Sequence, residues 1–267
     1  MSAWRIACAS VAACLALQGC GGAAFMLPQV SEKEALLAAR EVDADLDLPT
    51  FPRSRTYYQD AIHRLDRQLI RNVRPLCDRA ETSDCRFVFH YVADDEVNAF
   101  TAADGIYLHR GLLDYLESDE EIAAVMAHEM GHQIANHIEE SRDSILIGAL
   151  IGGLLMGGAG VIGGSTQETT EDMAAAGMGL GAQVGMLTFS KEQEREADLL
   201  AAYVLARAGM DLNRAGGTFA VLAKLDDRNW ASWNDTHPAG PQRIVAWRKA
   251  VASVDASGDQ LPVMTEP

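Results

Sequence analysis

Ten consecutive residues constrain this chain most: His128-Glu129-Met130-Gly131-His132-Gln133-Ile134-Ala135-Asn136-His137. The first five form the pattern HExxH. On a helix, residues four apart lie on one face, so His128 and His132 can present two imidazoles to one metal ion. Glu129 can reach a water molecule bound to that ion. Two nitrogen ligands, an open coordination position and a nearby carboxylate are what hydrolytic zinc chemistry needs. The alternative is an amphipathic helix that carries these residues by chance.

A hydrolytic zinc site needs a third protein ligand, and the residues just after HExxH do not offer one. The extension HExxHxxGxxH is absent, because Ala135 and Ile138 stand where it has glycine and histidine. His137 comes five residues after His132, which is about 140° around a continuous helix. His137 is therefore predicted to face away from the site, and we interpret it as structural.

A second acidic stretch, Glu192-Gln193-Glu194-Arg195-Glu196-Ala197-Asp198, offers a candidate third ligand. Glu194 and Asp198 are four apart and share a face of the predicted helix. Two like charges there are unfavourable unless a positive group lies beside them. A metal ion bound by Glu194, with Asp198 accepting a hydrogen bond from a ligand imidazole, would supply that group. On charge alone, these residues would instead form a solvated acidic face.

The remaining pattern predicts several helices and one small sheet. Apolar residues at helical spacing and helix caps indicate helices at 31–44, 53–73, 118–140, 191–209, 211–224 and 238–254. Residues 86–92 are typical of a strand, and Ala103-Asp104-Gly105 predicts a hairpin between two short strands. Ser118 and Glu121 form a capping box at the start of the HExxH helix. We expect an α+β fold that is mainly helical.

Residues 1–19 are predicted to be a lipoprotein signal peptide. An uncharged stretch, Ile6 to Leu17, follows Arg5 and is too short to span a bilayer. Leu17-Gln18-Gly19-Cys20 resembles a bacterial lipobox, in which the cysteine becomes the lipidated first residue, although Gln18 departs from the usual small or apolar residue. Gly21 replaces the aspartate that signals inner-membrane retention, so the resemblance favours the outer membrane, facing the periplasm. The alternatives are an uncleaved anchor and an ordinary secretory signal.

The mature chain is expected to have three parts: a tether and helix at 20–45, one domain at 46–255, and a frayed polar tail at 256–267. An apolar insertion rich in glycine and alanine occupies 145–190, and 145–164 contains no charged residue. This insertion is a membrane-dipping hairpin, a mobile lid or a packed internal segment. Cys77 and Cys85 could form a disulfide in an oxidising compartment, and the alternative is two free buried thiols.

Composition excludes one class of partner. The net charge is −16, and no cluster of lysine and arginine is long enough to track a phosphate backbone, so we expect no binding to nucleic acid. The hydrophobic fraction of 48% is ample for a core in a chain of 267 residues.

The combination of His128-Glu129-Met130-Gly131-His132 with Glu194-xxx-Asp198 resembles the zinc metallopeptidase family of the CAAX prenyl protease, HtpX and the mitochondrial inner-membrane stress protease. Three further stretches are similar to that family: Asn98-Ala99-Phe100 with Gly105 and Arg110-Gly111-Leu112-Leu113; Ser190 with Glu194 to Asp198; and Thr236-His237-Pro238 with Arg243-Ile244. Together they cover about residues 55 to 250. The resemblance is nearest to stand-alone periplasmic lipoproteins, because the helical repeats of the larger outer-membrane chaperone-protease are missing.

The resemblance implies a zincin-like metallopeptidase domain with a small β-sheet beside the active-site helix. It implies one zinc ion held by His128, His132 and Glu194, where Glu194 is the third ligand. Asp198 would support a ligand imidazole, and Glu129 would take a proton from the attacking water and pass it to the leaving amine. Zinc is preferred over other divalent ions by ligand type.

Other site residues follow from the same resemblance. His237 or Arg243 could stabilise the developing oxyanion. In relatives, the residue equivalent to His237 can instead occupy the open zinc position and hold the enzyme latent. The strand that contains Asn98, Ala99 and Phe100 would pair with an extended substrate backbone. Such pairing reads few side chains, so we expect broad specificity, biased to unfolded chains.

These observations predict a zinc metalloendopeptidase of periplasmic protein quality control. It would be lipid-anchored in the bacterial cell envelope and hydrolyse unfolded or misassembled envelope proteins, with outer-membrane assembly machinery as a further partner. The alternative from another class is a chaperone or assembly factor for outer-membrane proteins with little or latent proteolysis. The intact Glu129 favours catalysis. A third hypothesis, an integral membrane protease, depends on residues 145–164.

Overall fold

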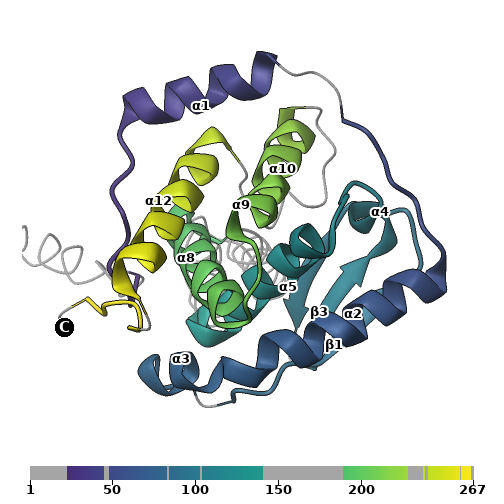
Figure 1. Ribbon diagram of the computed structural model, residues 1–267, viewed down its shortest axis with the longest axis horizontal. Coiled ribbons are helices and arrows are strands. Elements are labelled where there is room, and N and C mark those ends of the chain that lie inside the picture. Colours follow the sequence, from purple (N-terminus) through teal and green to yellow (C-terminus); the bar gives the residue numbers. More distant parts are fainter. Residues whose placement is uncertain are drawn as a thin grey trace, which may run out of the picture.

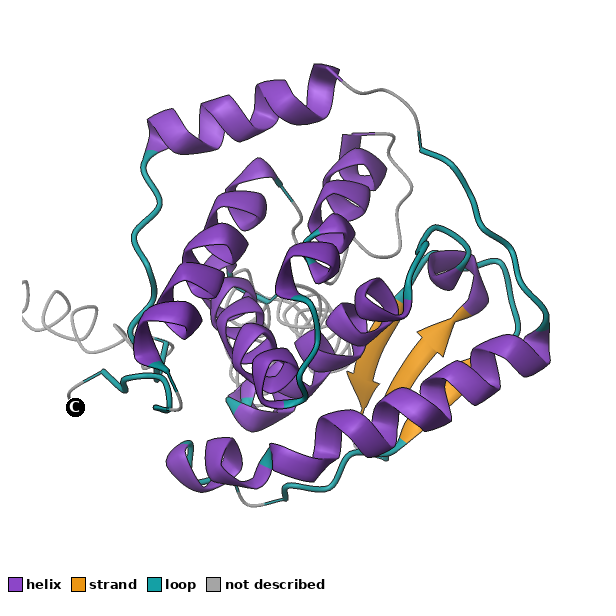
Figure 2. Ribbon diagram, in the orientation of Figure 1, coloured by secondary structure: helices purple, strands orange, loops and turns teal. Residues whose placement is uncertain are grey.

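The computed structural model describes residues 23–44, 48–82, 84–102, 104–140, 189–227, 237, 240–258 and 260–265. Their helices and strands, in chain order, are α1 (Glu32–Ala44), α2 (Arg55–Leu69), the 3-10 helix η1 (Ile70–Asn72), α3 (Arg74–Arg79), β1 (Phe89–Val92), β2 (Ala99–Ala102), β3 (Gly105–His109), α4 (Arg110–Leu113), α5 (Asp119–Ile134), α8 (Lys191–Arg207), α9 (Leu212–Ala215), α10 (Gly217–Asp227) and α12 (Pro241–Ser257). The fold is mainly helical with one small sheet, which confirms the predicted class (Figure 2).

The three strands lie in the order β1-β3-β2. β1 is parallel to β3, and β2 is antiparallel to β3, with Ala99 opposite Leu108. The predicted hairpin therefore joins β2 to β3. Gly105 begins β3 with φ +156, and a Cβ there would lie 2.6 Å from the carbonyl oxygen of Val88, so this turn requires glycine. α2 packs against β1, while α5 packs along β2 and β3 (Figure 1).

The centre of the molecule is the packing of α5 against α8 (Figure 1). Both helices begin with a capping box: Ser118 with Glu121 on α5, as predicted, and Ser190 with Gln193 on α8. The two backbones approach closely at Gly131, where a Cβ would lie 2.7 Å from the carbonyl oxygen of Ala197. This close approach brings the HExxH stretch next to Glu194.

Replacing Gly131 with alanine is expected to destabilise the protein by about 1–3 kcal/mol, the usual cost of overpacking. An alanine inside a helix normally stabilises it by roughly 1 kcal/mol over glycine. Here the new Cβ would also lie 2.9 Å from Ala197 Cα, so the helices would have to separate. Urea unfolding measures the change. The double substitution G131A/A197G should be no more stable than G131A, because the obstructing atoms belong to the backbone, and rescue by A197G would contradict this account.

Both ends of the described chain are packed, which corrects two predictions. Phe25 is fully buried and pairs with Met264, and Met26 N donates to Val263 O at 2.8 Å. α1 packs against α12, so residues 23–44 join the domain predicted to begin at 46 (Figure 1). The predictions of a free tether over 23–29 and a frayed tail over 260–265 are wrong. Residues 23–29 and 260–265 form backbone hydrogen bonds with each other, and burial of the Phe25 ring in the core stabilises this arrangement.

Several predictions lie outside the described residues: the signal peptide, the lipidation of Cys20, and residues 145–188 of the apolar insertion. No helix among the described residues combines the length and apolar character needed to cross a membrane. Cys77 and Cys85 form a disulfide with their Cα atoms 5.9 Å apart. It connects α3 to the segment that leads into β1.

Candidate metal centre

Four side chains that can bind a metal ion converge between α5 and α8: His128, His132, Glu194 and His237. HExxH places the first two one turn apart on α5. The first turn of α8 supplies Glu194, and His237 comes from the segment before α12. All four are at least 98% buried. The structure thus brings together the three predicted ligands, with His237 as a fourth.

The spacing of the ligand atoms fits one tetrahedral ion. Nε2 of His128 lies 3.1 Å from Nε2 of His132, 3.4 Å from Nδ1 of His237 and 3.4 Å from Oε2 of Glu194. Oε1 of Glu194 lies 3.3 Å from Nε2 of His132 and 2.9 Å from Nδ1 of His237. Zinc bonds of about 2.0–2.1 Å in a tetrahedron put ligand atoms about 3.3 Å apart. Imidazoles and one carboxylate are also the donors that zinc takes.

Electrostatics keeps two of these groups in the protonation state that a metal ligand needs. Burial alone would raise the pKa of Glu194, but His237, Arg243 and His128 outweigh it and hold that pKa well below 4.5. Burial lowers the pKa of His132 well below 6.5, so its ring is neutral. Burial and Arg243 also lower the pKa of His128, but Glu194 and Asp198 outweigh them and raise it to about 9. A metal ion bound at His128 therefore has to displace a proton there.

Asp198 and Arg243 lie behind the ligands. Asp198 Oδ1 is 2.9 Å from Nδ1 of His128, the arrangement predicted for a carboxylate that orients a ligand imidazole. Arg243 binds both oxygens of Asp198, with Nη2–Oδ1 2.7 Å and Nε–Oδ2 2.9 Å, and its Nη1 lies 2.8 Å from Oε2 of Glu194. All three guanidinium nitrogens thus contact carboxylates. These contacts favour a positioning role for Arg243 over the predicted oxyanion role.

Glu129 is fully buried beside the ligands, and strand β2 orients it. Thr101 Oγ1 donates to Oε2 of Glu129 at 2.8 Å and contacts its backbone oxygen at 3.1 Å. The other carboxylate oxygen, Oε1, has no hydrogen-bond partner among the described residues and lies 3.5 Å from Nε2 of His237. One oxygen is therefore held while the other faces the ligand cluster. The role of Thr101 was not predicted from the sequence, because nothing local connects it to residue 129.

The structure corrects the prediction that the HExxH helix continues to about residue 140. α5 ends at Ile134, Asn136 adopts φ +60, and a new helical turn begins at His137. This break turns His137 back toward the site, where its Nδ1 lies 3.0 Å from Nδ1 of His132. The prediction that His137 faces elsewhere is therefore wrong. An asparagine tolerates this left-handed conformation at a helix end, and that signal was available in the sequence.

The predicted substrate strand lies at an edge of the sheet, because β2 pairs with β3 alone among the described strands. The side chains of Asn98 and Ala99 are buried, and Asn98 Nδ2 donates to Oε1 of Glu96 at 3.0 Å. Phe100 is half-buried and stacks on Tyr107. Any contribution of Asn98 and Ala99 to binding an extended peptide would thus come from their backbone.

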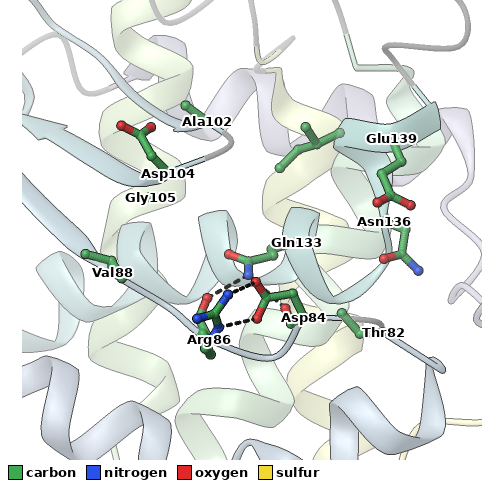
Figure 3. Close-up of a pocket in the computed structure, with 11 residues that line it drawn as sticks. Thr82, Asp84, Arg86, Val88, Ala102, Asp104, Gly105, Gln133, Asn136 and Glu139 are labelled. Carbon is green, nitrogen blue, oxygen red and sulfur yellow. Dashed lines mark hydrogen bonds and ion pairs between the residues drawn. The ribbon is translucent and has the colours of Figure 1, made fainter.

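A cavity of about 390 Å³ lies past the end of β2, and it is separate from the ligand cluster. Ala102 and Asp104 line one wall, while Gln133 and Asn136 at the end of α5 line another (Figure 3). Gln133 Nε2 donates to the carbonyl oxygens of Asp84 and Arg86 at 3.0 and 2.8 Å, which fixes this corner of the cavity to α5. None of the four candidate ligands lines it.

Comparison with known proteins identifies the family. Residues 63–251 match peptidase family M48, which covers well over half of the chain. The chain belongs to peptidase family M48. This confirms the family that its HExxH and ExxxD motifs resemble.

Three relatives show how far the similarity extends. Metalloprotease LoiP of Escherichia coli is 32% identical over 154 residues, which is 57% of this chain and 58% of LoiP. A putative beta-barrel assembly-enhancing protease of Vibrio cholerae is 32% identical over 175 residues, 61% of this chain and 34% of that protein. The mitochondrial metalloendopeptidase OMA1 of Arabidopsis thaliana is 32% identical over 148 residues, 55% of this chain and 28% of that protein. The chain therefore matches between 28% and 58% of the length of these relatives.

Proposed function

We propose that this protein is a zinc-dependent endopeptidase that cleaves unfolded or misassembled proteins of the bacterial envelope. The observation that carries the proposal is the buried set of His128, His132 and Glu194 beside the carboxylate of Glu129. Relatives named metalloprotease and beta-barrel assembly-enhancing protease support it. The second of these names supports a link to outer-membrane assembly machinery as partner.

The proposed chemistry is hydrolysis of a peptide bond by water. His128, His132 and Glu194 would hold a zinc ion, which when bound would lower the pKa of a water molecule and polarise the scissile carbonyl. Glu129 accepts the proton of that water at Oε1, because Thr101 already holds Oε2. The same carboxyl group then passes the proton to the leaving amine. The burial of the site excludes bulk water and strengthens these interactions.

We place the substrate along the edge of β2 that pairs with no described strand, as an added strand whose backbone pairs with Ala99 to Ala102. Thr101 connects this strand to Glu129, so a peptide paired here would lie next to the proposed base. The cavity past Ala102 offers room for a substrate chain that continues beyond β2. Backbone pairing explains the expected preference for unfolded proteins, which can present an extended segment.

We also propose that a lipid on Cys20 anchors the protein in the outer membrane, facing the periplasm. The lipobox-like sequence that ends at Cys20 supports this placement. An acidic domain with a disulfide between Cys77 and Cys85 is consistent with the oxidising periplasm.

Removal of the metal tests the central proposal. The purified protein should contain about one zinc ion and cleave an unfolded protein such as reduced, alkylated lactalbumin. A chelator should abolish cleavage, and stoichiometric zinc should restore it, because the site supplies the water activation. Elemental analysis and gel-based cleavage measure both. If the purified protein contained no zinc and still cleaved the substrate in the presence of the chelator, the proposal would be contradicted.

One observation favours the alternative of an assembly factor with latent proteolysis. His237 Nδ1 lies 3.4 Å from Nε2 of His128 and 2.9 Å from Oε1 of Glu194, so it would be a fourth ligand of a bound ion. A water molecule would need that position for catalysis. The same experiment separates the two functions: a zinc-loaded protein that keeps the unfolded substrate soluble without cleaving it fits the alternative.

A further inference from the structure

A second buried histidine stands directly behind the ligand His132. The break after α5 returns His137 to the core, where it is 1% exposed, and its Nδ1 lies 3.0 Å from Nδ1 of His132. The two ring nitrogens of His132 therefore face different partners. Nε2 faces the other candidate ligands, while Nδ1 faces His137.

The other nitrogen of His137 faces a buried carboxylate. His137 Nε2 lies 3.0 Å from Oε2 of Glu196, which is 2% exposed on α8. The second oxygen, Oε1, accepts a hydrogen bond from the backbone N–H of Phe25 at 2.8 Å. The N-terminal segment therefore completes a chain of contacts from Phe25 through Glu196 and His137 to His132.

Metal binding through Nε2 of His132 would determine which ring nitrogen of His132 and of His137 carries a proton. A nitrogen that binds a metal ion carries no proton, so a neutral His132 bound through Nε2 carries its proton on Nδ1. That N–H donates to Nδ1 of His137, whose own proton then sits on Nε2 and donates to Glu196. Each donor meets one acceptor. With the proton on Nε2 of His132, an N–H would instead point into the ligand cluster, toward Nε2 of His128 at 3.1 Å.

We propose that His137 and Glu196 are positioning residues that hold His132 in the tautomer and ring orientation required for zinc. The proposal rests on the zinc site proposed above. Under this proposal, different side chains orient the two histidine ligands of α5. His128 meets the carboxylate of Asp198 directly, whereas His132 reaches the carboxylate of Glu196 through a second imidazole. Carboxylates that orient ligand histidines generally strengthen metal binding.

Zinc affinity, measured by competition with a chromophoric chelator, tests the proposal without depending on cleavage. His137→Leu removes the acceptor for His132 Nδ1–H and should weaken zinc binding about 10–100-fold. His137→Gln should recover most of that loss, because its carbonyl can accept from His132 while its amide donates to Glu196. His63→Leu, at an exposed histidine on α2, serves as control and should leave zinc affinity unchanged.

The variants also separate positioning from simple packing. If His137→Leu leaves Oε2 of Glu196 without its partner and fails to fold, the double variant His137→Leu/Glu196→Gln removes the buried charge and keeps an acceptor for Phe25. Its expected zinc affinity is equally weak. Zinc affinity equal to wild type in the folded Leu variants, or no tighter in His137→Gln than in His137→Leu, would overturn the proposal. Absence of zinc binding in the wild-type protein would instead refute the zinc site itself.

Discussion

Replacing Glu129 with glutamine is expected to slow cleavage of an unfolded protein by about 10²–10⁴-fold, the usual contribution of a general base. The amide cannot accept the proton that the proposed mechanism places on Oε1. Glutamine has the same shape and can keep the contact with Thr101, so the fold should be unchanged. Bound zinc should also be unchanged, because Glu129 is outside the ligand set. Cleavage rates and zinc content of both proteins measure the effect.

The matched control for this experiment is Glu192→Gln, which removes the same charge from an exposed position at the start of α8. It should cleave as fast as the wild type. Equal cleavage by Glu129→Gln and the wild type would exclude Glu129 as the base. It would also favour an assembly factor in which the metal centre serves binding.

Replacing Arg243 with methionine is expected to lower the free energy of unfolding of the metal-free protein by about 3–5 kcal/mol. Arg243 is 5% exposed and contacts both Asp198 and Glu194, which are fully buried. Without the guanidinium, each of these two buried carboxylates loses one of its positive neighbours. Added zinc should recover part of the loss, because it also neutralises Glu194. Urea unfolding with chelator and with zinc measures both effects.

The control for this second experiment is Arg248→Met, also on α12. Arg248 pairs with Glu41 at 2.7 Å, but both side chains are more than half exposed, so solvent screens their ion pair and its loss should change stability little. A loss in Arg243→Met as small as that in Arg248→Met would show that the buried network does not depend on the guanidinium.

The sequence predicts the parts of this protein that depend on local pattern. The capping box at Ser118 and the antiparallel pairing of β2 with β3 follow from short-range backbone chemistry, and both are present in the described residues. The mainly helical fold and the M48 family were also predicted. The candidate ligand Glu194 required the family resemblance, since charge alone made it one residue of an acidic face.

The parts that the sequence did not predict depend on contacts between distant segments. Glu192 and Glu196 look alike in the sequence, yet Glu192 is exposed and Glu196 is buried. What distinguishes them is the N–H of Phe25, 171 residues away, together with His137. His137 itself was misplaced because helical periodicity was continued past Asn136, whose left-handed conformation ends α5.

The pairing of Phe25 with Met264 also limits how far the domain can lie from a lipid attached to Cys20. Phe25 is fixed to the domain by its buried ring and by its hydrogen bond to Glu196. Only Gly21 to Ala24 separate it from Cys20, and five peptide units span at most about 18 Å. A lipid on Cys20 would therefore hold this edge of the domain within that distance of the bilayer surface. A protease anchored in this way would stay at the membrane surface. It would therefore meet polypeptides that lie close to the membrane more often than polypeptides that diffuse in the periplasm.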